Sequence, residues 1–129
     1  MKKFKKTDKQ LLRDGVRWFL SRKSLNHVEV NLVRLNDPAD HGYADHVGPY
    51  EFDIAINPKA SRTDFTKLRT LFHELTHVEQ FATGRLASTE KGWFWMGDNM
   101  DHVAYEEQPW EIEANAVESI LAELYLEVS

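Results

Sequence analysis

His73, Glu74 and His77 form the pattern H-E-x-x-H, two histidines four residues apart with a glutamate directly after the first. On a helix, residues four apart lie on one face about one turn apart, so both imidazoles can point at one metal ion. Glu74 is rotated by about 100 degrees from His73 and lies beside that ion. A carboxylate placed there is suited to act as general base on a metal-bound water. The pattern is short, so the rest of the chain must supply support for this chemistry.

The helix predicted from about residue 64 to residue 83 has one apolar stripe, whose members are Leu68, Leu71, Leu75, Val78 and Ala82. His73 and His77 fall roughly opposite this stripe, so they are not core histidines. Two solvated histidines on a polar face are the plain alternative. Phe72 and Phe81 flank the histidine side, however, which indicates that other parts of the chain cover it. Covered histidines need partners, and a metal ion is one.

A catalytic zinc ion generally has three protein ligands and a water. The extended pattern H-E-x-x-H-x-x-G-x-x-H is excluded, because Gln80 and Thr83 occupy its glycine and third histidine positions. A later helix offers Glu111 and Glu113, which lie on opposite flanks, roughly 160 degrees apart. Glu111 is favoured because it lies in the first turn, and because Asn115 one turn further along can orient it by hydrogen bonding. Glu113 remains the alternative ligand.

The segments "LFHELTHVEQ" and "QPWEIEAN" resemble the gluzincin-type zinc metallopeptidases. They are most similar to small phage- and bacterium-encoded peptidases of the SprT-like and ImmA/IrrE-like kind. In the latter, a glutamate in an E-x-x-x-N helix completes the site, which corresponds to Glu111 and Asn115 here. The resemblance covers about residues 50 to 117 and implies one zinc ion bound by His73, His77 and Glu111. The third histidine and the cysteine zinc ribbon usual in SprT-like proteins are not evident in this sequence.

Peptide-bond hydrolysis is the activity that this resemblance implies, with a protein or peptide as substrate. Glu74 would act as the general base on a zinc-activated water. An additional donor is needed at the oxyanion, and Tyr105 is the first candidate, ahead of His102. The alternative function is a metal-binding zincin-like interaction module without proteolytic activity, which the presence of Glu74 argues against. The aromatic run from Trp93 to Trp95 can line a cleft, although such runs more commonly belong to a core.

An α+β fold should position these residues, with a small mixed sheet packed against an N-terminal helix, the H-E-x-x-H helix and a C-terminal helix that carries the glutamate. Helices are predicted over residues 7–24, 64–83 and from Pro109 onward, strands within residues 27–35 and 50–57, and a hairpin that turns at residues 97–99. Asp64 is the predicted N-cap and Gly84 the C-terminal glycine of the central helix. Residues 36–49 are predicted to form a polar loop that can include a short strand around Tyr43 to Val47.

The strand within residues 50–57 is bracketed by Pro49 and Pro58, which indicates an edge strand. In the family that the sequence resembles, such a strand lies over the active-site cleft. An extended substrate peptide could then add to it as a further strand.

The 129 residues are enough for one zincin-like domain, in which about residues 1–8 form a disordered basic tip. The net charge of −5 makes nucleic acid an unsuitable partner. The chain lacks an apolar run of about 20 residues, which argues against a membrane span. It also lacks cysteine, so disulfides and thiolate metal sites are excluded. With no signal peptide evident, the sequence predicts a cytoplasmic protein.

Overall fold

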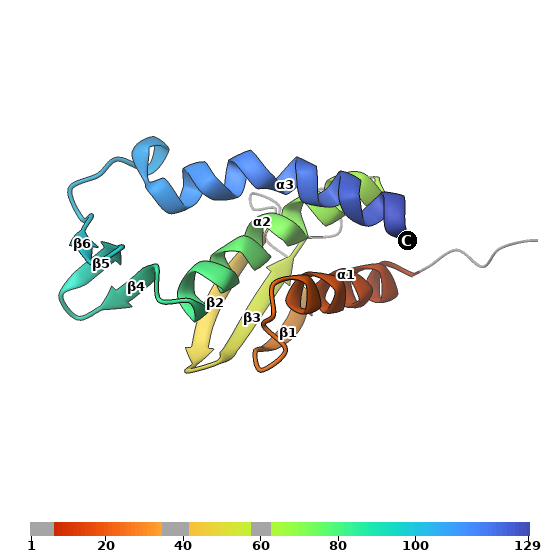
Figure 1. Ribbon diagram of the computed structural model, residues 1–129, viewed down its shortest axis with the longest axis horizontal. Helices are drawn as coiled ribbons and strands as arrows, with labels where there is room; N and C mark the ends of the chain where they lie inside the picture. Colours follow the sequence, from red (N-terminus) through yellow and green to blue (C-terminus); the bar gives the residue numbers. More distant parts are fainter. Residues whose placement is uncertain (1–6, 35–41, 58–62) are drawn as a thin grey trace, which may run out of the picture.

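The structure is a computed structural model that describes residues 7–34, 42–57 and 63–129. It confirms the predicted α+β fold, with two small sheets and three α-helices in this part of the chain (Figure 1). The helices are α1 (Asp8–Arg22), α2 (Asp64–Ala82) and α3 (Pro109–Val128), and a short 3-10 turn, η1 (Tyr105–Glu107), precedes α3. The strands are β1 (Glu29–Arg34), β2 (Gly42–Gly48), β3 (Glu51–Ile56), β4 (Leu86–Thr89), β5 (Gly92–Trp95) and β6 (Asp98–Asn99). Most of the predicted basic tip, residues 1–6, lies outside the described residues.

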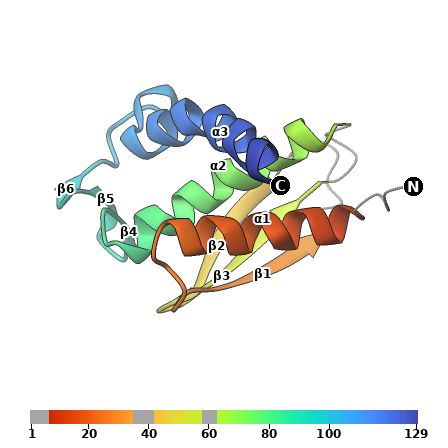
Figure 2. The ribbon, with the colours of Figure 1, turned by 45° about the vertical axis from the view of Figure 1, so that its right-hand side comes forward.

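Helix α2 lies between the first sheet and α3, with α1 alongside it (Figures 1 and 2). Four residues of its predicted apolar stripe are fully buried: Leu68, Leu71, Leu75 and Val78. Phe72 is also fully buried, and its ring packs against Trp18 and Phe19 of α1 and against Tyr125 of α3. Structure therefore covers α2 on several sides, including the side that carries the histidines.

Helix α2 is capped by Thr63 rather than by the predicted Asp64. The Thr63 hydroxyl accepts a hydrogen bond from the Thr66 N–H (3.1 Å), and the Thr66 hydroxyl accepts one from the Thr63 N–H (3.2 Å). This reciprocal capping box satisfies two backbone donors, and Asp64 becomes the first helical residue, where its charge favours the helix N-terminus. Gly84 follows the C-cap Thr83 with a φ of +77°, which confirms the predicted C-terminal glycine.

The first sheet is mixed and has the strand order β1-β3-β2, with β3 parallel to β1 and antiparallel to β2. The prediction that residues 50–57 form an edge strand is therefore wrong, because β3 is central. Pro49 and Pro58 lie outside β3 in the sequence, so neither removes an N–H group from its ladders. The edge nearer to α2 is β2, a seven-residue strand that contains the short strand expected around Tyr43 to Val47 and is one residue longer at each end.

Gly42 brings the start of β2 close to α2. A Cβ atom at this position would lie 2.7 Å from the carbonyl oxygen of Ala55 and 3.2 Å from the Thr70 methyl group. A side chain here would clash with the backbone of β3 at Ala55 and would also crowd Thr70 of α2, so glycine permits the close approach of all three elements. Thr70 precedes His73 by one helical turn, so the close approach brings the edge strand beside the histidines.

The second sheet is a three-stranded meander, β4-β5-β6, of which the sequence predicted only one hairpin. The turn between β5 and β6 consists of Met96 and Gly97, with φ values of +53° and +89°, and Trp95 pairs with Asp98 across it. Two consecutive residues with positive φ are typical of the tight type I′ hairpin turn, so the turn begins one residue before the predicted position. The meander ends in a loop that leads through η1 into α3.

Helix α3 begins at Pro109, as predicted, where proline fits because the first helical N–H has no intrahelical partner. Its buried residues are Trp110, Ala114, Leu121, Ala122 and Tyr125. Within the described residues, no helix is both long and apolar enough to cross a membrane.

Replacing Phe72 by alanine should lower the free energy of unfolding by about 3–5 kcal/mol, because the ring joins all three helices and its loss leaves a cavity. Urea denaturation followed by circular dichroism measures this change. Ile112→Ala is the matched control, since Ile112 lies on the exposed side of α3 and should change stability by less than about 0.5 kcal/mol. Equal losses in the two variants would contradict the role given to Phe72.

Candidate metal centre

His73 and His77 direct their Nε2 atoms at the same carboxylate oxygen. Glu111 Oε1 lies 3.0 Å from Nε2 of His73 and 3.1 Å from Nε2 of His77. One ligand atom from each of the three residues lies within 4.8 Å of the other two. The three side chains come from two helices, α2 and α3, whose packing brings them together. Two imidazole nitrogens and a carboxylate oxygen in this arrangement can hold a metal ion.

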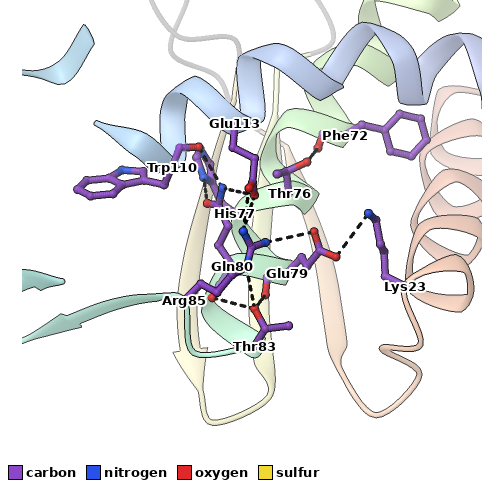
Figure 3. A network of polar contacts seen from close by, with 10 residues as sticks. All are labelled: Lys23, Phe72, Thr76, His77, Glu79, Gln80, Thr83, Arg85, Trp110 and Glu113. Atoms are coloured by element: carbon purple, nitrogen blue, oxygen red, sulfur yellow. Dashed lines mark hydrogen bonds and ion pairs between the residues drawn. The ribbon is translucent and has the colours of Figure 1, made fainter. Parts of the chain in front are cut away.

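Gln80 holds the ring of His77 in place. Its side chain is fully buried, and its Oε1 atom lies 2.8 Å from Nδ1 of His77 (Figure 3). The Gln80 amide nitrogen donates to the Trp110 carbonyl oxygen and to Glu113 Oε1, both at 3.0 Å. Because the nitrogen already donates to two acceptors, the oxygen faces the imidazole and accepts a hydrogen bond from the Nδ1–H group. Nε2 is then the atom that is free to bind a metal ion.

Glu118 plays the same part for His73. Its Oε1 atom lies 3.3 Å from Nδ1 of His73, and its other oxygen pairs with Arg69 at 3.3 Å. A carboxylate at Nδ1 again leaves Nε2 for the metal and makes the imidazole a better ligand. Asn115 was expected to orient Glu111, but it is exposed, and none of the described hydrogen bonds joins it to Glu111. Glu118, which lies one turn of α3 after Asn115, contacts the site instead.

Glu113, the alternative third ligand, points away from the histidine pair. Both of its oxygens accept hydrogen bonds from Nη1 of Arg85, at 2.8 and 3.0 Å, and one also accepts from Gln80. Arg85 contacts Glu79 as well, at 3.6 Å, and Glu79 lies 3.5 Å from Lys23 (Figure 3). Glu113 therefore holds the Gln80 amide by a hydrogen bond and is not one of the three groups that could hold the metal ion.

The charges of the group favour a cation between these side chains. Burial alone would raise the pKa of Glu111, but the hydrogen bonds and charges of His73 and His77 lower this pKa to about 2. Burial alone would lower the pKa of each histidine, but the hydrogen bond with Glu111 and the nearby carboxylates raise both above the ordinary value of 6.5. Protons thus occupy the positions that a metal ion would take, and metal binding must release them.

Glu74 is buried beside the histidines, with 8% of its surface exposed. Burial raises the pKa of its carboxyl group, and the positive charges of His73 and His77 only partly oppose this effect. A carboxyl group whose pKa lies closer to neutrality takes up and gives back a proton more readily. Glu74 therefore combines a position next to the metal group with an environment suited to a general base.

The metal group opens into a cavity of about 260 Å³ between four parts of the fold. Its lining residues are Gly42, Tyr43 and Ala44 of β2, His73, Glu74, His77 and Phe81 of α2, Leu86 and Trp93 of the meander, and Tyr105, Trp110 and Glu111. The cavity thus includes Tyr105, whose pKa is raised by partial burial, by the charges of Glu111 and Glu74 and by a hydrogen bond with Glu111. His102 is exposed and does not line the cavity.

A larger cavity of about 720 Å³ lies elsewhere, between α1 and β1. Its ionisable lining residues are Asp8, Lys9, Arg13, Arg17 and Lys67. Lys67 and Asp8 form an ion pair at 3.0 Å, and the metal group does not line this cavity. Size alone therefore does not mark the candidate site, because the group that could hold a metal ion lines the smaller cavity.

Three supporting residues of the site were not predicted from the sequence as supports: Gln80, Glu118 and Arg85. Helical spacing offered a signal for two of them. Gln80 follows His77 by three residues, and Glu118 lies two turns after Glu111 on the same flank of its helix. Arg85 follows the helix-ending glycine, and no periodic pattern connects it to Glu113.

No protein-family model, no curated protein and no solved structure matches this chain. The function is therefore inferred from the geometry of the metal group, together with the resemblance of the sequence motifs to gluzincin-type peptidases.

Exchanging Glu111 for glutamine should weaken zinc binding by more than about 100-fold, since this removes a direct ligand, whereas losing a supporting residue typically costs 10–100-fold. Glu113→Gln is the matched control and should weaken binding by no more than about tenfold, through Gln80. Competition with a chromophoric chelator measures both affinities. A greater loss in the Glu113 variant would assign the third ligand to that residue.

Zinc should raise the melting temperature more at pH 8 than at pH 6. The raised histidine pKa values stabilise the metal-free protein below pH 6.5, and this contribution is lost as the pH rises through the folded-state pKa values. The lowered pKa of Glu111 contributes stability above about pH 4.5 that is lost only as the pH falls towards 2, so it is constant over this range.

Scanning calorimetry with and without zinc at the two pH values measures this difference. The His73→Ala/His77→Ala double variant serves as the control and should show no zinc-dependent shift at either pH. An equal or larger shift at pH 6 in the unmodified protein would contradict competition between zinc and protons for the two histidines.

Proposed function

We propose that the protein is a zinc-dependent metallopeptidase of the gluzincin type, with His73, His77 and Glu111 as the zinc ligands. The observation that carries this proposal is the convergence of the two Nε2 atoms on one Glu111 oxygen, with Glu74 buried directly beside them. Two nitrogens and one oxygen suit zinc, and three protein ligands leave a fourth position for water, as in catalytic zinc sites. The partners of the two Nδ1 atoms, the buried Gln80 and the half-buried Glu118, also match the surroundings of metal-binding histidines.

A bound zinc ion would supply Lewis-acid chemistry, polarising a carbonyl group and lowering the pKa of water from 15.7 to roughly 7. Glu74 takes a proton from the water, and the water oxygen attacks the carbonyl carbon of the scissile peptide bond. Glu74 then gives this proton to the nitrogen of the leaving amine as the C–N bond breaks. The products are a carboxylic acid and an amine, so no further reactant is needed.

Tyr105 is the proposed hydrogen-bond donor to the oxygen on which negative charge develops. It lines the cavity that contains Glu74 and Glu111, and its raised pKa keeps the phenol protonated and able to donate. Its exposed side chain comes from η1, immediately before the helix that carries the third ligand.

Strand β2 is the proposed binding edge for an extended protein or peptide substrate. Among the described strands it pairs only with β3, so its other edge can accept a further strand. Its first three residues, Gly42 to Ala44, line the cavity of the metal group. This assignment replaces the edge strand predicted over residues 50–57, and it places the backbone of a peptide beside Glu74.

Glu74→Gln should keep zinc at one ion per chain and lower peptide cleavage by about 10²–10⁴-fold, because it removes the general base and none of the ligands. Metal analysis and cleavage of a broad peptide library, read by mass spectrometry, measure the two properties. Glu123→Gln, a change on the exposed side of α3, should alter neither. Zinc binding without cleavage by the unmodified protein would instead support an interaction module.

A further inference from the structure

The cavity at the metal group has two unlike walls. His73, Glu74, His77 and Glu111 form the charged wall. A second, apolar part of the lining, the aromatic wall, comes from Phe81, Trp93 and Trp110. All of the charged residues that line the cavity belong to the first wall, so the second one offers only aromatic rings and Leu86 to whatever enters.

Trp93 is held by neighbouring aromatic rings and by a backbone hydrogen bond, although part of its side chain is accessible. Its ring stacks on Trp110, with the centroids 5.8 Å apart and the planes 17° from parallel, and it also contacts Phe81 at 6.2 Å. Trp110 is buried, and its carbonyl oxygen accepts a hydrogen bond from Gln80. The Trp93 N–H donates to Asp101 at 2.8 Å, which holds the backbone as well.

The contacts of Trp93 with Trp110 and Phe81 leave part of its side chain accessible to a ligand. Trp93 remains 42% exposed even though it packs on two other aromatic rings. Tyr43, on β2, lines the same cavity and is 41% exposed. Large apolar side chains that line a cavity and also meet solvent are typical of binding sites, where a ligand completes their burial.

We propose that Trp93, stacked on Trp110, forms a subsite for a large apolar side chain of the substrate, aromatic or aliphatic, next to the bond that is cleaved. This inference rests on the proposed peptidase function and adds the class of side chain that the site accepts. The cavity of about 260 Å³ is smaller than the roughly 300–1,000 Å³ of pockets for drug-sized ligands, which suits one side chain beside the reacting amide. An acidic side chain would lose hydration against the aromatic wall and find no cationic residue on that wall.

Two hydroxamates test the subsite without requiring cleavage. Acetohydroxamate and N-hydroxy-3-phenylpropanamide bind zinc through the same group and differ in the phenyl-bearing arm. In the zinc-loaded protein, the phenyl compound should bind about tenfold more tightly, as expected for partial burial of an aromatic ring. Isothermal titration calorimetry gives both affinities, and their ratio reports the subsite alone.

The variants are Trp93→Ala, Trp93→Gln, which keeps bulk without a ring, and Trp93→Phe. The affinity ratio should fall to about twofold or less in the first two and return towards tenfold in Trp93→Phe. Tyr50→Ala is the control, because Tyr50 is an exposed aromatic residue outside the cavity, and it should leave the ratio unchanged.

Equal binding of the two hydroxamates, or a full preference in Trp93→Ala and Trp93→Gln, would overturn the subsite and leave the peptidase proposal standing. If the zinc-loaded protein bound neither compound, no open zinc position would be present, and the proposed function and the subsite would both be rejected.

Discussion

The polar side of α2 is buried against α3, and the rest of the site depends on this contact. A central helix with apolar residues on one side and histidines on the other cannot be covered unless each buried polar atom has a partner. Glu111 meets the Nε2 atoms of both histidines, while Gln80 and Glu118 meet their Nδ1 atoms. In the part of the chain that the structure describes, no buried side-chain nitrogen or oxygen lacks a hydrogen-bond partner.

Joining two helices through such a buried polar cluster has a cost in free energy. Burying carboxylates and imidazoles forfeits their hydration, and well-packed apolar residues commonly hold helices together at least as well. The hydrogen bonds and charges of His73 and His77 lower the pKa of Glu111 to about 2, so the carboxylate favours positive charge at this place. A single metal cation bound here would supply this positive charge in place of the protons. This exchange is the physical basis for the function proposed above.

One set of contacts supports both walls of the cavity. Gln80 binds His77 through its oxygen, and through its nitrogen it binds the carbonyl group of Trp110, on which Trp93 stacks. Glu113 accepts a hydrogen bond from the same amide, and Arg85 in turn binds Glu113 (Figure 3). A single buried side chain, Gln80, thus contacts both the candidate ligand His77 and Trp110 of the aromatic wall. A change in the position of either residue should therefore alter the position of the other.

Local patterns were sufficient for the three helices and for the candidate ligands. The spacing of apolar residues predicted α1, α2 and α3, including the start of α3 at Pro109, and helical angles separated the histidines from the core stripe. These features depend on neighbours within about two turns, which a sequence displays directly. Local patterns also favoured Glu111 over Glu113. One of the two reasons holds, since Glu111 lies in the first turn of α3, but the described hydrogen bonds do not include one with Asn115. The structure adds the pairing of Glu113 with Arg85.

Only the tertiary structure decided which strand lies at the edge, which residues hold the histidine rings, and which aromatic ring lines the cavity. Flanking prolines could not place β3, because the order of strands depends on pairing between distant segments, and β2 lies in a stretch with the composition of a loop. The sequence by itself determined three helices and a set of residues able to bind a metal ion. How those residues face one another follows from the packing of α2 against the sheet and α3, since contacts between distant segments leave no periodic trace in the chain.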